Sequence, residues 1–493
     1  MKKLYKYTFA IFILLVSGCS DVLDIETDGT ISGDVLTNDD TIEKSLIGAY
    51  YSLGGITDGI DGGELLGGDF IVIPTLMARA QGIEIFWSSV QAPGYANFID
   101  KDIITTNIRV VDNWKRAYEV INTVNNILLN IGNVSATNKD RVQGEALAIR
   151  GILYFEMVRL WAPQYDADGV NPASDLAIPV LTEPIVAVDQ IETPTLSTID
   201  EVYNRAEADL SSASALLMPL GKNGTRLNYY ACQAYLARLS LQKGEFANAR
   251  TYADNVIASG EYTLTSTPLT AFNNTSNSPE DIFAVQQTLA NNTGDRSSGS
   301  GITTFYSSLL ESGLGILGIL KFSLNSSFLI NSPKFSAGDL RGTVDLLADS
   351  STSSNQINTA FYRNVYNTAL ISSAKYIRAD NVLPIIRLSE MYLTRAEATF
   401  ESLGSAVTQE AVDDLNVIRS RAGISTVSVS DFATPEAFFD SLALERTREL
   451  LYEGQLLHDL KRWGGYIGSN FDPKDPWDPE YVLPIPQSEQ DTW

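Results

Sequence analysis

The side chains that most often carry out catalysis are scarce in this chain of 493 residues. It contains one histidine, His458, and two cysteines, Cys19 and Cys232. A catalytic triad needs a nucleophile, a base and a group that orients the base, and a zinc site needs several histidines or cysteines. His458 lies in a charged helical stretch and Cys232 in an apolar one, so we expect both to be structural.

Acidic side chains are abundant and leave two kinds of chemistry open. With 60 Asp and Glu residues, a carboxylate pair of the glycosidase type is possible, although the fold would have to bring the two groups together. Residues 165–169, YDADG, resemble the start of a calcium loop, with Asp166 and Asp168 as candidate ligands, but Ala177 stands where such a loop needs a glutamate. We expect no cofactor, with a structural calcium ion as the alternative.

The segment FWSSVQAPGYANF, residues 86–98, has the side chains that a sugar-binding surface needs. Sugar rings have weakly apolar faces bordered by hydroxyls, so they bind to exposed aromatic planes flanked by amide or carboxylate groups. The candidate ligand contacts around its Pro-Gly turn are Trp87, Gln91, Tyr95, Asn97 and Phe98. The alternative is that these rings belong to the core, and it is stronger for the two phenylalanines, Phe86 and Phe98, than for Trp87 and Tyr95.

Between about residues 263 and 382 the composition changes to stretches rich in Ser, Asn, Thr and Gly, which favour turns. Only EDIFAVQQT, residues 280–288, is predicted to be a strand. Because the region is also rich in Phe and Tyr, we expect a folded, loop-rich module rather than a disordered linker. Tyr306, within GSGITTFYSS, is its candidate ligand contact, since loops on a rigid scaffold commonly carry binding residues.

Helical periodicity predicts the scaffold that must position these loops. Apolar residues recur at three- and four-residue spacing over residues 42–53, 114–128, 142–157 and 202–217. Ser197 and Asp200 are expected to form the capping box of the last of these helices. Residues 228–262 have the spacing of a tetratricopeptide-type helical pair, with Gly244 at the turn.

Three helix-patterned segments, residues 383–400, 414–424 and 444–464, precede the proline-containing segment YVLPIP. Thr408 is the expected cap of the second helix, which should stop at Gly423, and the third should begin at Thr434-Pro435. Two pairs of opposite charges are helical neighbours in the third, Glu445 with Arg448 and Arg446 with Glu449. Because leucines alternate with these ions, some ions must lie against other helices, where an ion pair fixes geometry more than it adds stability.

This block resembles the C-terminal pattern of the SusD/RagB family of outer-membrane lipoproteins. The matching residues are Arg387, Leu388, Glu390, Tyr392, Ala396, Glu397, Ala398, Asn416, Arg419, Arg421, Ala422, Gly423, Glu445, Arg446, Glu449, Leu450, Glu453, Gly454, Asp459, Leu460, Arg462, Trp463, Pro484, Ile485, Pro486 and Glu489. One departure is Leu456, which stands where the family pattern has an arginine. The resemblance implies a tetratricopeptide-like helical body, binding of a glycan, and partnership with a SusC-like TonB-dependent transporter. It also implies that the region before Trp114 carries part of the ligand surface.

The N-terminal residues predict a lipid anchor. Lys2 and Lys3 precede an apolar run that is too short to span a bilayer, and Val16-Ser17-Gly18-Cys19 has the pattern of a lipoprotein signal-peptidase site. Cys19 would then be acylated and would hold the protein to outer-membrane lipid. The alternative is an ordinary secretory peptide with a chance cysteine. The acidic residues that follow Cys19 imply, by the same family resemblance, exposure at the cell surface.

These observations predict a mainly α fold: a tetratricopeptide-like helical-pair scaffold with a loop-rich, aromatic-containing module laid on it. The expected organisation is a signal peptide (1–18), an acylated linker (19–36), an N-terminal helical body (37–262), the loop-rich module (263–382) and a C-terminal helical block (383–493). The formal charge of −25 argues against nucleic acid as a partner.

The function expected from these features is capture of an oligosaccharide or polysaccharide at the cell surface and its delivery to the transporter, without catalysis. A peptide-capturing or tetratricopeptide-type interaction lipoprotein is one alternative, and a carboxylate-pair glycan-processing enzyme is another. Loss of sugar binding on truncating the aromatic residues would favour the first interpretation, peptide affinity the second, and release of reducing ends the third.

Overall fold

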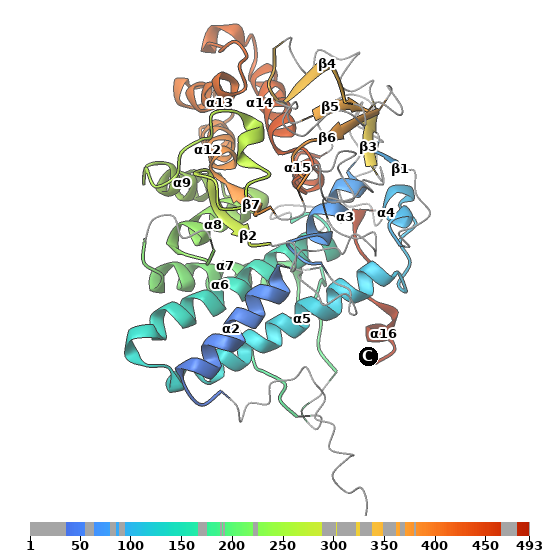
Figure 1. Cartoon of the computed structure of the whole chain (residues 1–493), viewed down its shortest axis with the longest axis vertical. Coiled ribbons are helices and arrows are strands. Elements are labelled where there is room, and N and C mark those ends of the chain that lie inside the picture. The colour runs from blue at the N-terminus through green and yellow to red at the C-terminus, as the bar shows by residue number, and fades with distance from the viewer. Residues whose placement is uncertain are drawn as a thin grey trace, which may run out of the picture.

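A computed structural model describes most of the chain. The described residues are 36–54, 64–78, 85–87, 94–165, 175–187, 190, 193–219, 225–287, 302, 322–325, 338–348, 361–364, 370–378, 381–464 and 481–492. Helices predominate among them, in agreement with the expected fold class (Figure 1). The helices are α2 (Asp39–Leu53), α3 (Asp69–Met77), α4 (Ala96–Asp100), α5 (Ile108–Leu129), α6 (Ala136–Trp161), α7 (Ile199–Leu216), α8 (Tyr229–Lys243), α9 (Phe246–Ile257), α12 (Leu388–Ser402), α13 (Gln409–Arg421), α14 (Pro435–Leu450), α15 (Leu456–Arg462) and α16 (Gln487–Gln490).

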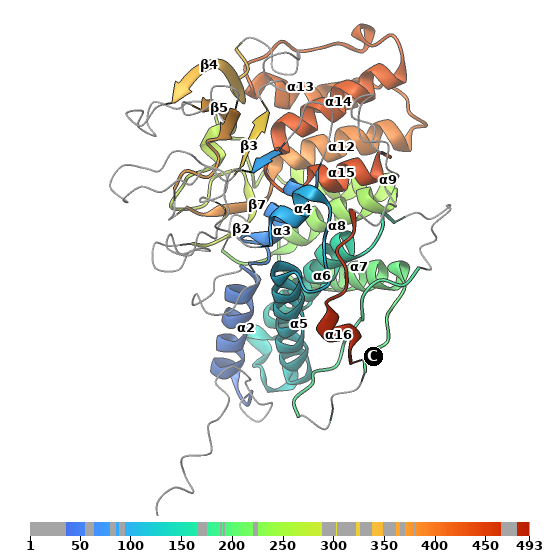
Figure 2. The same cartoon turned by 90° about the vertical axis from the view of Figure 1, so that its right-hand side faces the viewer.

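The first half of the chain forms a layer of long helices, with α2, α5, α6 and α7 lying side by side in the lower part of the molecule (Figures 1 and 2). Local sequence explains where two of them begin. Asn38 accepts hydrogen bonds from the amides of the first turn of α2, and Thr198 forms a capping box with Glu201 at the start of α7. The predicted position of this capping box, Ser197 with Asp200, was therefore one residue too early.

Helices α6 and α7 approach closely because Gly151 has no side chain. A Cβ atom at this position would lie 2.9 Å from the carbonyl oxygen of Ala206 and 3.0 Å from Cγ of Leu210, both on α7. In contrast, Gly48 on the exposed side of α2 has nothing within 4 Å of the same position. The two glycines thus occupy opposite environments inside regular helices.

We expect the same substitution to have opposite effects at these two glycines. Gly151→Ala should lower the free energy of unfolding by about 1–3 kcal/mol, because the added methyl group overpacks the α6–α7 contact. Gly48→Ala should raise it by about 0.5–1 kcal/mol, because alanine stabilises an exposed helix interior relative to glycine. Urea unfolding of both variants measures the difference; equal shifts would contradict the packing argument.

Helices α8 and α9 form the expected tetratricopeptide-like pair. They pack antiparallel around Gly244, which adopts a positive φ of 75° at the turn. Their buried residues include the small or apolar Ala234, Ala237, Ala253 and Val256, and α9 also packs on α12 of the C-terminal block. Cys232 is fully buried in α8, which confirms its prediction as a core residue.

One antiparallel sheet of two strands and one mixed sheet of five strands complete the fold. Strands β2 (Asp281–Val285) and β7 (Leu383–Arg387) form one sheet, and the other has the order β1-β3-β6-β5-β4, from β1 (Ile85–Trp87), β3 (Phe322–Asn325), β4 (Gly342–Ala348), β5 (Phe361–Asn364) and β6 (Leu370–Ser373). Strand β2 confirms the strand predicted for residues 280–288. The prediction that it is the only strand between residues 263 and 382 was wrong, because four further strands lie in the same region. Residue 85 pairs with residue 324, a partnership that local composition does not reveal.

The C-terminal block contains the expected helices with two differences. Thr408 and Thr434 cap α13 and α14 as predicted, and Gly423 follows α13 with a φ of 76°. However, residues 383–387 form strand β7, and the third segment divides into α14 and α15. The division falls at Tyr452 and Gly454, whose φ angles of 68° and 77° are incompatible with a continuing helix.

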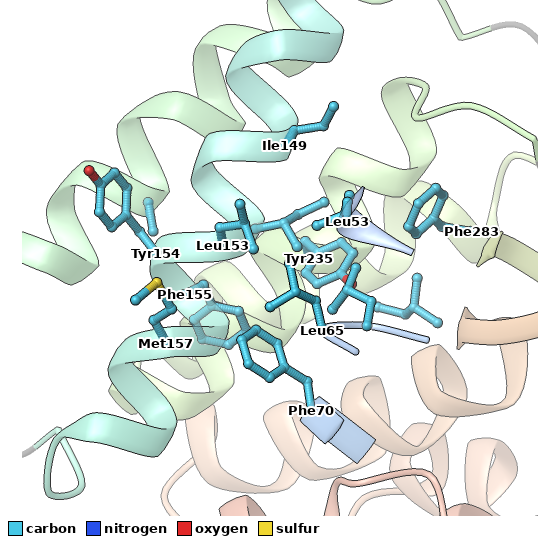
Figure 3. Packing of buried hydrophobic residues seen from close by; sticks show 14 of the residues in the cluster. Leu53, Leu65, Phe70, Ile149, Leu153, Tyr154, Phe155, Met157, Tyr235 and Phe283 are labelled. Carbon is cyan, nitrogen blue, oxygen red and sulfur yellow. The ribbon is translucent and has the colours of Figure 1, made fainter. Parts of the chain in front are cut away.

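Most buried apolar side chains form one large core, while those of α13 and parts of α12 and α14 form a second cluster. Figure 3 shows Phe70 and Phe155 meeting near the centre of the large core, with Leu65 and Tyr235 beside them. Leu456, which replaces the arginine of the family pattern, belongs to the same core and is 7% exposed. An apolar residue at this position is thus accommodated by ordinary hydrophobic packing.

A network of buried ion pairs lies among β2, β7 and α14; we call it the Arg387 cluster. Arg387 contacts three carboxylates: Nη1 is 2.6 Å from Oε1 of Glu280 and 2.6 Å from Oε1 of Glu449, and Nε is 2.8 Å from Oε2 of Glu453. Arg421 also pairs with Glu280 and Glu449. The expectation that some charges in the last helices lie against other elements is therefore confirmed.

The two helical charge pairs expected in α14 have different outcomes. Arg448 Nη1 is 2.6 Å from Oε1 of Glu445, as the spacing predicted. Arg446 instead pairs with Asp459 of α15, at 2.9 Å, while Glu449 belongs to the Arg387 cluster. Arg446 and Glu449 are thus paired with charges from other elements, whereas Arg448 keeps its partner within α14.

Candidate functional site

The residues that the sequence suggested for ligand binding are only partly within the described chain. Trp87 ends strand β1, opposite Phe322 of β3, and the orientation of its side chain lies outside what the structure describes. Gln91 and Tyr306 lie outside the described residues, as do the candidate calcium ligands Asp166 and Asp168 and the lipidation candidate Cys19. Tyr95, Asn97 and Phe98 are described and lie together at the start of α4.

Tyr95 is a core residue, so the expectation that its ring is exposed for ligand binding is corrected. The side chain is 0% exposed, and its hydroxyl donates a hydrogen bond to Oδ1 of Asp69 at 2.5 Å. The guanidinium of Arg109 covers the ring at 4.6 Å from its centroid. Burial, reinforced by the negative charge of Asp69, raises the pKa of the Tyr95 hydroxyl well above its ordinary value.

Phe98 is also 0% exposed, and its ring packs edge-on against Tyr95 with the centroids 6.2 Å apart. The two residues are three apart on α4, so one face of this short helix directs both rings inward. Phe98 is therefore corrected to a core residue as well. Asn97, between them, is partly exposed; its Nδ2 donates to the carbonyl oxygen of Asp102 at 2.9 Å, and its Oδ1 accepts from Asn107.

Asn107 joins the end of the 86–98 segment to the first turn of α5. Its Oδ1 caps the helix by accepting from the backbone amides of Arg109 and Val110, while its Nδ2 donates to the carbonyl oxygen of Gly94 at 2.8 Å. Gly94 has a φ of 91°, which favours glycine there. The sequence reasoning missed Asn107, although an asparagine directly before a helical run is a recognisable N-cap signal.

A buried polar cluster lies under this junction; we call it the Asp69 cluster. Asp69, at the start of α3, accepts hydrogen bonds from Tyr95 and from Nδ2 of Asn113 at 2.6 Å, and it is 3.7 Å from Nη1 of Arg109. Arg109 is also 3.8 Å from Glu64. Burial disfavours the charge of Arg109, but Asp69 and Glu64 outweigh this effect and raise its pKa.

The Asp69 cluster holds together three elements that are distant in the sequence. Because a buried carboxylate is stable only when its oxygens are hydrogen-bonded, the positions of α3, α4 and α5 depend on one another. The cluster therefore fixes the chain at Tyr95, on the C-terminal side of the 86–98 segment, while β1 pairs with β3 on its N-terminal side.

His458 and Cys232, which could act as a base and as a nucleophile, are both buried. His458 in α15 is 2% exposed; burial, with the nearby cations Arg159 and Lys461, lowers its pKa well below the ordinary value, so the imidazole is neutral. Burial raises the pKa of the Cys232 thiol to about 12. Within the part of the chain that the structure describes, no group of three or more His, Cys, Asp or Glu residues is arranged to hold a metal ion.

The comparisons with known proteins agree with the fold. The family model described as "SusD family" matches residues 331–492, and the model described as "Starch-binding associating with outer membrane" matches residues 83–241. The chain is 25% identical to SusD-like protein P2 of Formosa agariphila, over 99% of this chain and 97% of that protein. It is also 34% identical to the starch-binding protein SusD of Bacteroides thetaiotaomicron over 101 residues, which cover 20% of this chain and 16% of that protein.

Solved structures show the same architecture over nearly the whole chain. A SusD superfamily protein from Bacteroides thetaiotaomicron superposes with a TM-score of 0.72 at 24% identity, covering 92% of this chain and 97% of the other. A protein from Bacteroides vulgatus described as a putative sugar binding protein superposes with a TM-score of 0.70 at 24% identity, covering 92% and 96%.

The fold is thus the tetratricopeptide-like helical-pair fold of the SusD superfamily. With two family models and a full-length relative in agreement, the chain belongs to the SusD/RagB family. The resemblance inferred from the C-terminal residues is confirmed.

Proposed function

We propose that the protein is a lipid-anchored, surface-exposed component of the outer membrane that captures an oligosaccharide or polysaccharide and delivers it to a SusC-like TonB-dependent transporter, without catalysis. The observation that carries the proposal is the match of residues 83–241, which include the whole 86–98 segment, to the family described as starch-binding and associating with the outer membrane. None of the described helices has the length and apolar character of a membrane-spanning segment. The proposed anchor is an acyl group on Cys19, which ends the signal-peptidase pattern Val16-Ser17-Gly18-Cys19.

The proposed ligand surface lies around Trp87 rather than around Tyr95 and Phe98. The rings of Tyr95 and Phe98 are buried in the core, whereas Trp87, at the end of β1, stays a candidate ligand contact. Tyr306 and Gln91 stay candidates for the same surface.

Identification of the glycan comes first. We suggest affinity electrophoresis of the chain from residue 20 onward, which retains every described residue. The gels contain starch, another neutral polysaccharide, or no polysaccharide. Retardation by one polysaccharide identifies the ligand class. Migration unchanged in all gels, together with binding of peptides in a parallel screen, would favour the peptide-capturing alternative.

Trp87→Ala should weaken binding of the identified glycan about tenfold, since a stacked indole contributes about 1–2 kcal/mol and 1.4 kcal/mol corresponds to a factor of ten. Isothermal titration measures the affinity. Trp114→Phe is the matched control, because Trp114 is a buried tryptophan of α5 and should leave affinity unchanged in folded protein. Unaltered affinity in Trp87→Ala, with wild-type melting, would place the ligand surface elsewhere.

A further inference from the structure

A groove of about 670 Å³ lies where the turn between α8 and α9 meets the end of α12, the first turn of α14 and the end of α15. Its volume falls within the range of about 300–1,000 Å³ that is usual for small-molecule sites. The groove is separate from the region of Trp87: the five-stranded sheet that contains β1 and the helix α9 lie on opposite sides of the molecule in both views (Figures 1 and 2).

Aromatic rings form much of the wall of this groove. Trp463 and Phe439 meet edge to face with centroids 5.7 Å apart, and Tyr165 and Phe246 line the same space. All four side chains are partly exposed. The indole N–H of Trp463 donates to Oε1 of Glu397 at 2.7 Å, which fixes the plane of the ring.

Glu401 provides a hydrogen-bond acceptor with unused capacity. Its Oε2 accepts a hydrogen bond from the Ser405 hydroxyl at 3.2 Å, and within the described chain it takes part in no ion pair. A carboxylate can accept about four hydrogen bonds, so several remain for a ligand. Glu397, one turn earlier, differs because Arg462 and Trp463 already occupy both of its oxygens.

The cations beside the groove are already neutralised. Lys243 is 2.9 Å from Glu207 and 2.7 Å from Glu245, and Arg462 pairs with Glu397 and Asp459. An anionic ligand would therefore find no unpaired positive charge and would approach the carboxylate of Glu401. A neutral ligand avoids this cost, and its choice over a cationic one rests on the proposed function.

We propose that the groove is a second carbohydrate subsite, in which a neutral sugar ring packs against the parts of Trp463 and Phe439 that Arg462 and Phe400 leave uncovered, while a sugar hydroxyl donates to Glu401. Aromatic rings next to a carboxylate match the apolar face and hydroxyl border of a sugar ring. The choice of ligand class rests on the proposed function; the position of the subsite rests only on the groove.

The test uses ¹⁹F NMR of the chain from residue 20 onward labelled with 5-fluorotryptophan. The full chain has six tryptophans, and Trp463→Phe and Trp87→Phe assign the two resonances that matter. The probes are maltose, cellobiose and N,N′-diacetylchitobiose, titrated to millimolar concentrations. We expect at least one of them to shift the Trp463 resonance in a saturable manner, and we expect Glu401→Ala to weaken that binding about tenfold, because a charged acceptor is lost.

Glu183→Ala is the matched control, because Glu183 is an exposed carboxylate on a loop, and it should leave the titration unchanged. A Trp463 resonance that no probe moves, or equal affinity in Glu401→Ala and wild type, overturns the subsite. Failure of the proposed function is a different result: no polysaccharide would retard the protein and Trp87 would respond to none of the glycans. Retardation with a silent Trp463 resonance would refute the subsite alone.

Discussion

Replacing Arg387 by methionine is expected to lower the free energy of unfolding by about 3–5 kcal/mol, the usual consequence of removing one partner from a buried ion network. Arg387 is 1% exposed and contacts Glu280, Glu449 and Glu453, all of which would lose a cation. Methionine keeps much of the side-chain volume, so the loss reports charge rather than a cavity. Guanidinium unfolding at neutral pH measures it.

The matched control for this variant is Arg250→Met. Arg250 pairs with Glu410 on the surface, with side-chain exposures of 37% and 45%, so its loss should change stability by less than about 1 kcal/mol. Similar losses of unfolding free energy in both variants would show that burial does not increase the contribution of the Arg387 cluster to stability.

The same cluster predicts a dependence on pH. Burial opposes the charge of Glu280 and Glu449, but Arg421 and Arg387 outweigh it, so the pKa values of both carboxyl groups lie below their ordinary value. A lowered folded-state pKa contributes stability above the unfolded pKa, which is about 4.3, and that contribution is lost as the pH falls. Wild-type stability should thus decline below about pH 4.5, and the decline should be shallower in Arg387→Met.

Cys19→Ala is expected to abolish membrane attachment completely, because acylation of Cys19 is the proposed anchor and a single residue carries it. Fractionation of cells and incorporation of a labelled fatty acid measure the loss. Protease treatment of intact cells should degrade the wild type if it is exposed at the surface.

The other cysteine offers a matched control for the anchor. Cys232→Ala changes a buried residue of α8 and should leave the protein acylated and membrane-bound. Membrane attachment that survives Cys19→Ala would contradict the lipid anchor, and a wild type protected from protease in intact cells would contradict surface exposure.

Helical elements were predictable because their signals are local. Thr408 and Thr434 cap helices within a few residues of the apolar repeats that they start, and Gly244 marks the turn of the α8–α9 pair. The four additional strands could not be predicted in the same way. Strand β1 pairs with β3 more than 200 residues later, so its hydrogen bonds depend on tertiary structure.

The candidate ligand residues were less predictable for a related reason. The Pro-Gly turn beside Tyr95 suggested that the tyrosine ring is exposed. The ring is instead buried, and its hydroxyl donates a hydrogen bond to Asp69, 26 positions earlier in the sequence. The same applies to Arg446, whose nearest helical neighbour of opposite charge, Glu449, is held by Arg387 and Arg421 instead. Helical spacing identifies possible partners, whereas the packing of other elements decides among them.

The last described segment of the chain, residues 481–492, has a consequence for the order of folding. The amide of Leu483 donates to the carbonyl oxygen of Leu160, the indole of Trp161 donates to that of Pro484, and the amide of Gln487 donates to that of Thr105. These contacts join residues more than 300 positions apart, so the end of α6 acquires its partners only when residues 483–487 are available. A chain that emerges N-terminus first during synthesis or export must therefore leave this part of the helical body incomplete until residues 483–487 have emerged.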